Sequence, residues 1–148
     1  MGDIKKVIFV AGSGTCRAPM AAGILRSMPF AKDLEVCARG LVVLFPEPMN
    51  QKAEAVMISN GITWDGFMSQ QLEESDITDH TLILTMDAAL RQKVIDSFEG
   101  ATEENTRVLS AYVGDEIEIV DPYGGSLQTY GLCFEVMKRT MEKLEGLL

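Results

Sequence analysis

A short loop at residues 11–19 carries the residues of this chain that are best suited to chemistry, in the order Ala-Gly-Ser-Gly-Thr-Cys-Arg-Ala-Pro. The loop follows an apolar run at residues 7–10 and precedes a helical pattern. In such a unit the backbone N–H groups of the loop converge on one point, and the helix adds its positive end. Arg17 could then bind phosphate oxygens with its planar guanidinium. The pattern predicts a phosphate-binding loop made of Gly12, Ser13, Gly14, Thr15, Cys16 and Arg17.

A second motif, Asp-Pro-Tyr-Gly-Gly-Ser, occupies residues 121–126. Together, Cys16, Arg17, Pro19 and this Asp-Pro pair resemble the signature of the low-molecular-weight protein tyrosine phosphatases, in particular their bacterial branch. Residues 38–41 and 69–72 occupy the places that this family expects after the second strand and before the third. The resemblance covers essentially the whole chain.

The resemblance implies a catalytic role for Arg17 and Asp121 and reveals a missing nucleophile. In the family a cysteine six residues before the arginine attacks phosphorus, and the aspartate protonates the leaving group. Here that position is Ala11, and the hydroxyls of Ser13 and Thr15 do not occupy the in-line position in the family's loop. Loss of the nucleophile of a covalent enzyme can lower turnover by a factor on the order of 10⁶. We therefore expect binding of phosphate or a phosphorylated protein side chain, with dephosphorylation absent or very weak.

Two further departures bear on the origin of Ala11. The family's hydroxyl after the arginine is Ala18 here, and the family's left-handed loop asparagine is Gly14. Glycine adopts the left-handed conformation without strain, so the loop can keep its shape. An engineered variant would normally change only the cysteine, so the joint loss of two thiolate-supporting positions favours natural decay of catalysis. The alternative is an engineered nucleophile-to-alanine variant of an active bacterial protein phosphatase. Both origins remain open at this point.

The side chain that carries the phosphate also remains open. Thr15 stands where bacterial arginine phosphatases of the family have threonine and many tyrosine-specific members have a bulkier aliphatic residue. A small threonine leaves room for a guanidinium, whereas an apolar wall suits a phenyl ring. Tyr123 and Phe45 could flank either group, so phosphotyrosine and phosphoarginine are both considered.

Composition limits the other possibilities. The 148 residues suit one domain, 1–148, and a net charge of −9 argues against a nucleic-acid partner. No apolar run reaches the ~18–20 residues that span a bilayer, so we expect no membrane partner and a cytoplasmic location. The three cysteines are dispersed without metal spacing, and Cys37 and Cys133 are interpreted as packing residues. We expect no cofactor and no metal, and the oligomeric state is not indicated.

The elements that must position these residues alternate between strands and helices. Strands are predicted at residues 6–10, 35–38, 81–85 and 106–109. Helices are predicted from Pro19 onward, from a cap at Asn50 to about residue 60, from a cap at Asp87 to residue 98, and at residues 127–147. This alternation predicts an α/β fold, a three-layer α/β/α arrangement around a four-stranded parallel sheet. The ligand should lie beyond the carboxyl ends of the strands, where the loop after the first strand is.

Overall fold

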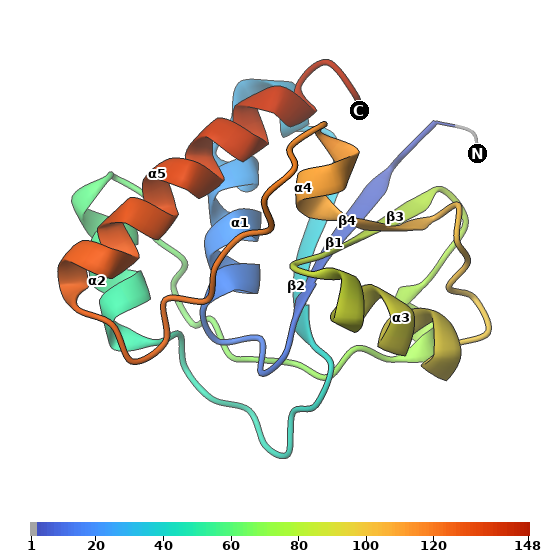
Figure 1. Cartoon of the computed structure of the whole chain (residues 1–148), viewed down its shortest axis with the longest axis horizontal. Coiled ribbons are helices and arrows are strands. Elements are labelled where there is room, and N and C mark those ends of the chain that lie inside the picture. Colours follow the sequence, from blue (N-terminus) through green and yellow to red (C-terminus); the bar gives the residue numbers. More distant parts are fainter. Residues whose placement is uncertain (1–2) are drawn as a thin grey trace.

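The computed structural model describes residues 3–148; Met1 and Gly2, the first residues of the predicted domain 1–148, lie outside this range. At its centre is a four-stranded sheet in the order β2-β1-β3-β4, with all neighbouring pairs parallel (Figure 1). The strands are β1 (Lys6–Ala11), β2 (Glu35–Gly40), β3 (Thr81–Thr85) and β4 (Thr106–Val108). The predicted four-stranded parallel sheet is confirmed.

The central strands β1 and β3 are apolar on both sides because both of their faces are covered. Val7 and Phe9 of β1 belong to one apolar cluster, whereas Ile8 and Val10 belong to another on the opposite face. Successive strand residues point to opposite faces, so a continuous apolar run is what a doubly covered strand requires.

The helices form the two outer layers (Figure 1). The larger cluster joins the sheet to α1 (Arg17–Arg26), α2 (Gln51–Ser59) and α5 (Leu127–Leu144). The smaller cluster joins the opposite face to α3 (Ala88–Ser97) through Val94. The remaining elements are short: η1 (Pro29–Ala31), η2 (Glu74–Asp76) and α4 (Leu109–Tyr112). The three-layer α/β/α prediction is thereby confirmed.

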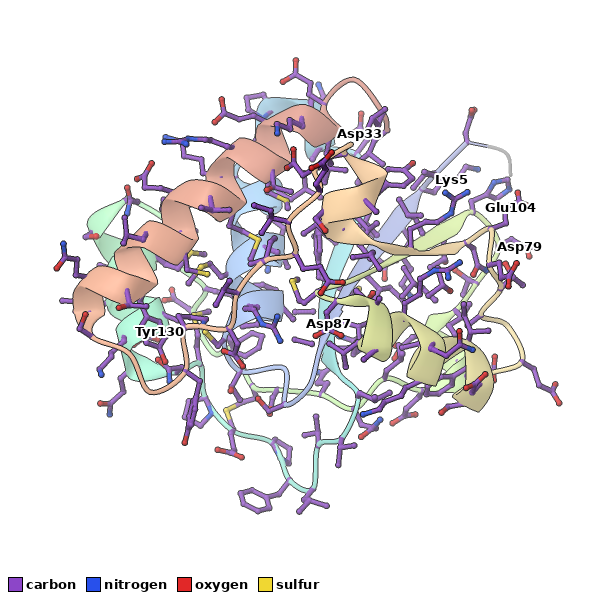
Figure 2. All side chains as sticks on the ribbon, viewed as in Figure 1. Lys5, Asp33, Asp79, Asp87, Glu104 and Tyr130 are labelled. Atoms are coloured by element: carbon purple, nitrogen blue, oxygen red, sulfur yellow. The ribbon has the colours of Figure 1, made fainter. Side chains whose placement is uncertain are left out.

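Side-chain caps fix where three of the helices begin. Asn50 accepts hydrogen bonds from the backbone N–H groups of Lys52 and Ala53, and Asp87 accepts one from Leu90. Ser126 caps α5 in the same way. Such caps satisfy N–H groups that have no partner within the helix. Asp87 can be seen at the start of α3 in Figure 2.

Some predicted boundaries were wrong by a few residues. β2 continues to Gly40, since Gly40 pairs with Ala11 at the end of β1. The fourth strand ends at Val108 and not at Leu109, because Leu109 begins α4 and is fully buried. The closing helix ends at Leu144.

Candidate phosphate-binding site

The predicted phosphate-binding loop, residues 12–17, lies between the end of β1 and the first residue of α1. Two of its backbone carbonyls accept hydrogen bonds from neighbouring segments. The N–H of Val42 donates to the carbonyl of Gly12 at 3.1 Å, and that of Asn50 donates to the carbonyl of Thr15 at 2.9 Å. These bonds tie the phosphate loop (residues 12–17) to the chain after β2 and to the cap of α2.

The N–H groups of the phosphate loop have no such partners. Within residues 3–148, no backbone–backbone hydrogen bond uses the N–H groups of residues 13–17 as donors. Unpaired N–H groups in a loop at a helix N-terminus provide the donors that bind an anion. These N–H donors are therefore available, while the carbonyls of Gly12, Thr15 and Cys16 accept hydrogen bonds from other backbone N–H groups.

Two glycines give the phosphate loop its shape. Gly14 has a φ of +74°, and a Cβ there would lie 2.8 Å from the backbone nitrogen of Gly40. A Cβ on Gly40 would in turn lie 2.7 Å from the carbonyl oxygen of Ser13. The phosphate loop and the end of β2 approach so closely that neither glycine can be replaced without movement of the backbone.

Arg17 and Asp121 come together although they belong to distant parts of the sequence. Arg17 is only 9% exposed, and its guanidinium donates to the backbone carbonyl of Ile119 at 3.0 Å. The other end of the guanidinium lies 3.9 Å from Oδ2 of Asp121. The second carboxylate oxygen of Asp121 accepts a hydrogen bond from the N–H of Tyr123 at 3.1 Å. One arginine thus joins the phosphate loop to the loop that contains Asp121.

Ala11, the residue that precedes the phosphate loop, is buried in the larger apolar cluster. The nearest thiol in sequence is that of Cys16. Burial raises the pKa of its thiol to about 12, with further increases from Cys133 and Asp121 that outweigh the opposing effect of Arg17. Only the thiolate is a strong nucleophile, so Cys16 is an inert thiol near neutral pH.

Of the other predicted site residues, Ser13 and Thr15 belong to the phosphate loop, whereas Phe45 and Tyr123 lie on two other segments. The hydroxyls of Ser13 and Thr15 are 3.0 Å apart and share a hydrogen bond. Tyr123 is largely exposed on the turn after Asp121. Phe45 is also largely exposed, on the loop that follows Val42, whose N–H donates to the carbonyl of Gly12 at 3.1 Å.

Sequence reasoning missed Lys52, which joins α2 to the Asp121 loop. Its ammonium donates to the carbonyl of Gly125 at 2.6 Å and lies 5.8 Å from the ring centre of Tyr130. Tyr130, labelled in Figure 2, is fully buried in the first turn of α5, the helix that packs on α2. No sequence signal could have revealed this contact, because a bond to a backbone carbonyl requires no particular residue at position 125.

Residues 3–148 contain no group of three or more histidine, cysteine, aspartate or glutamate side chains that could hold a metal ion. No helix in the same range is both long and apolar enough to cross a membrane.

A parallel α/β sheet with a glycine loop and a buried arginine after its first strand is typical of proteins that bind phosphate groups. The family model for low molecular weight phosphotyrosine protein phosphatases matches residues 6–148. The chain therefore belongs to the low molecular weight phosphotyrosine protein phosphatase family.

Bacterial relatives of this chain carry two kinds of name. A low molecular weight protein-tyrosine-phosphatase, PtpB of Staphylococcus haemolyticus, is 30% identical over 94% of this chain and 96% of the relative. A protein-arginine-phosphatase of Geobacillus stearothermophilus is 24% identical over 94% of this chain and 93% of the relative.

Solved structures give the same picture. The YwlE arginine phosphatase from Geobacillus stearothermophilus superposes with a TM-score of 0.86 at 26% identity, covering 96% of this chain and 91% of that one. A low molecular weight protein tyrosine phosphatase from T. tengcongensis gives a TM-score of 0.87 at 26% identity, covering 97% and 99%. The resemblance to the bacterial members of the family is thereby confirmed.

Proposed function

We propose that this chain binds phosphate or a phosphorylated protein side chain in the phosphate loop and does not turn it over efficiently. The observation that carries this proposal is a loop with available N–H donors and a buried arginine, preceded by Ala11, whose side chain is only a methyl group. A protein of this kind acts by occupying a phosphorylated site and not by removing the phosphate.

The physical chemistry of the phosphate loop supports binding. A thiolate would repel a phosphate dianion, and a methyl group does not. Hydrogen bonds that involve a charged group contribute roughly 1.5–3 kcal/mol each. Among the described residues, the guanidinium of Arg17 donates one hydrogen bond, to the carbonyl of Ile119, which leaves further donors for phosphate oxygens.

The same chemistry argues against efficient hydrolysis. A covalent route needs a nucleophile below the phosphorus, and Ala11 has none. Cys16 stays protonated, with a pKa of about 12 raised chiefly by burial. The hydroxyls of Ser13 and Thr15 bond each other, and neither has a hydrogen bond to a basic side chain in the described residues. Asp121 could protonate a leaving group, but no side chain at position 11 would attack the phosphorus to expel that group.

The names of the relatives define the ligands to test. Relatives are called protein-tyrosine-phosphatase and protein-arginine-phosphatase, so phosphotyrosine and phosphoarginine are the two candidate side chains. Titration calorimetry with phosphate, vanadate and both phosphoamino acids measures the binding. We expect heat of binding for phosphate, and a weaker signal for Arg17→Lys. No heat for any of these ligands at millimolar concentration would refute the proposal.

A second candidate function is that of a protein phosphatase inactivated at one position. The 3.9 Å approach of Arg17 to Asp121 favours it, since this pair is not needed for binding alone. Ala11→Cys, assayed with p-nitrophenyl phosphate, separates the two candidates. Strong turnover by Ala11→Cys would favour an inactivated copy of a working enzyme. No measurable turnover would favour long divergence towards binding.

A further inference from the structure

An apolar groove lies between residues 115–122 and α5. It encloses about 610 Å³. Four large apolar side chains along it are exposed: Ile117 by 80%, Val120 by 75%, Leu132 by 63% and Val136 by 49%. Exposed apolar side chains that gather in one hollow mark a surface that binds something. We call this feature the α5 groove.

Along one wall of the α5 groove, the backbone N–H groups of residues 116–120 have no backbone partner in the described residues. In Figure 1 the segment between α4 and α5 runs beside α5 without joining the sheet. The segment is held instead by Arg17, bonded to the carbonyl of Ile119, and by Glu118, whose carboxylate accepts from the N–H of Ala88. Unpaired backbone groups beside apolar pockets can bind an extended polypeptide.

The α5 groove is lined by negatively charged side chains, which favour a positively charged binding partner. Its lining contains Asp115, Glu116 and Glu118 and no basic side chain. Asp115 is paired with Lys143, whereas Glu116 and Glu118 form no ion pair within residues 3–148. A second copy of this chain would bring the same carboxylates and a net charge of −9. Charge complementarity therefore favours a basic partner over self-association.

The α5 groove and the candidate phosphate site share the segment that contains Asp121. Val120 and Pro122 line the groove on either side of Asp121, the residue whose carboxylate lies 3.9 Å from Arg17. A polypeptide with its phosphorylated side chain in the phosphate loop would pass Asp121 and enter the groove. The two sites can therefore be occupied by one chain.

We propose that the α5 groove docks the polypeptide that carries the phosphorylated side chain, through an extended segment in which apolar and basic residues alternate. This inference rests on the proposed function, because it assumes that a phosphorylated side chain occupies the phosphate loop. Alternation is required because side chains of an extended segment point to opposite sides in turn. Its apolar side chains pack on Val120, Leu132 and Val136, and its basic side chains lie near Glu116 and Glu118.

Fluorescence anisotropy with synthetic peptides tests the inference. Each peptide carries phosphotyrosine or phosphoarginine beside a five-residue segment of alternating leucine and lysine, placed on either side of the phosphorylated residue. In one control serine replaces the leucines, and in another glutamate replaces the lysines. We expect the leucine–lysine peptide to bind at least tenfold more tightly than both controls.

Protein variants locate the effect. Leu132→Asp should bring the leucine–lysine peptide to within twofold of the serine control. Ile117→Asp is a second variant, on the opposite wall, that keeps the test valid if the first fails to fold. Ile58→Asp changes an exposed apolar residue of α2 outside the groove and should have no effect. Calorimetry with inorganic phosphate should give the same affinity for all of these variants.

The outcomes separate the two proposals. If phosphate binds but the three peptides bind equally, the docking groove is refuted and the proposed function stands. If phosphate does not bind, the proposed function fails and the inference fails with it. A dimer in sedimentation velocity that Leu132→Asp dissociates would refute the inference in favour of self-association.

Discussion

Gly14→Ala tests whether the phosphate loop depends on the close approach of two backbones. Gly14 has a φ of +74°, and an added Cβ would lie 2.8 Å from the nitrogen and 3.0 Å from the Cα of Gly40. The left-handed conformation costs an alanine roughly 1–2 kcal/mol. Crowding against a backbone, which cannot rotate away as a side chain can, adds roughly 1–3 kcal/mol. We therefore expect the free energy of unfolding to decrease by about 2–5 kcal/mol.

Two other glycines separate these contributions. Gly66 has a φ of +73° with nothing within 4 Å of an added Cβ, so Gly66→Ala should lose only the conformational part, roughly 1–2 kcal/mol. Gly131 lies within α5 and also has nothing within 4 Å of an added Cβ. Gly131→Ala should therefore stabilise the protein by roughly 0.5–1 kcal/mol.

Urea denaturation of the three variants, followed by circular dichroism, measures these differences. In thermal unfolding the decrease for Gly14→Ala should be visible at roughly 2–4 °C per kcal/mol. Calorimetry with phosphate should show that Gly14→Ala binds more weakly than the other two variants. If Gly14→Ala is no less stable than Gly66→Ala, the packing of the phosphate loop against Gly40 is refuted.

Three further predictions concern charge and pH. Arg17→Lys loses the planar fork and should weaken phosphate binding roughly 10- to 100-fold in calorimetry; a change within twofold would contradict the role given to the guanidinium. Burial raises the pKa of Cys16 to about 12, so the rate at which iodoacetamide alkylates this thiol in the folded protein should keep increasing up to pH 10. Mass spectrometry of the peptide that contains Cys16 measures this rate, and a plateau below pH 9 would contradict the raised pKa. Burial alone would raise the pKa of Asp76, but hydrogen bonds from Arg39 and the backbone of Glu73 lower it below 3.8. A carboxyl group whose pKa is lower in the folded protein stabilises it fully above pH 3.8, and this stabilisation is lost as the pH falls through the pKa of the folded protein. The difference in unfolding free energy between the original chain and Asp76→Asn should therefore shrink between pH 5 and roughly pH 2. A difference that stays constant with pH would contradict the pairing of Asp76 with Arg39.

Much of the fold could be predicted because its signals are local. β3 was predicted at residues 81–85, its observed bounds, since a strand buried on both faces is a short apolar run between polar residues. The starts of α2 and α3 followed from Asn50 and Asp87, whose side chains cap the helices they precede. The end of β4 could not be predicted in this way. Only three of its residues pair with β3, and whether Leu109 extends a strand or begins a helix depends on tertiary packing.

In the candidate site, too, the residues that could be predicted are those whose signals are local in the sequence. The glycines and Arg17 of the phosphate loop are adjacent in sequence and could be recognised together. The approach of Asp121 to Arg17 was expected only from the resemblance to a family, since the spacing of the two residues does not imply it. The bond from Arg17 to the carbonyl of Ile119 had no signal at all, because every residue offers a carbonyl. The α5 groove could not be predicted from the sequence for a related reason, because its apolar side chains come from two segments that meet only in the folded protein.

The place of α5 in the chain has a consequence during synthesis. β1 is one of the two central strands and is made first, but the face formed by α1 and α2 is covered only when α5 packs on both helices. A ribosome adds about 5–20 residues per second. Until residues 127–144 emerge from the ribosome, Tyr130, Phe134 and Met137 cannot fill the larger apolar cluster. The apolar surface of the nascent chain is therefore exposed to chaperones during this part of synthesis.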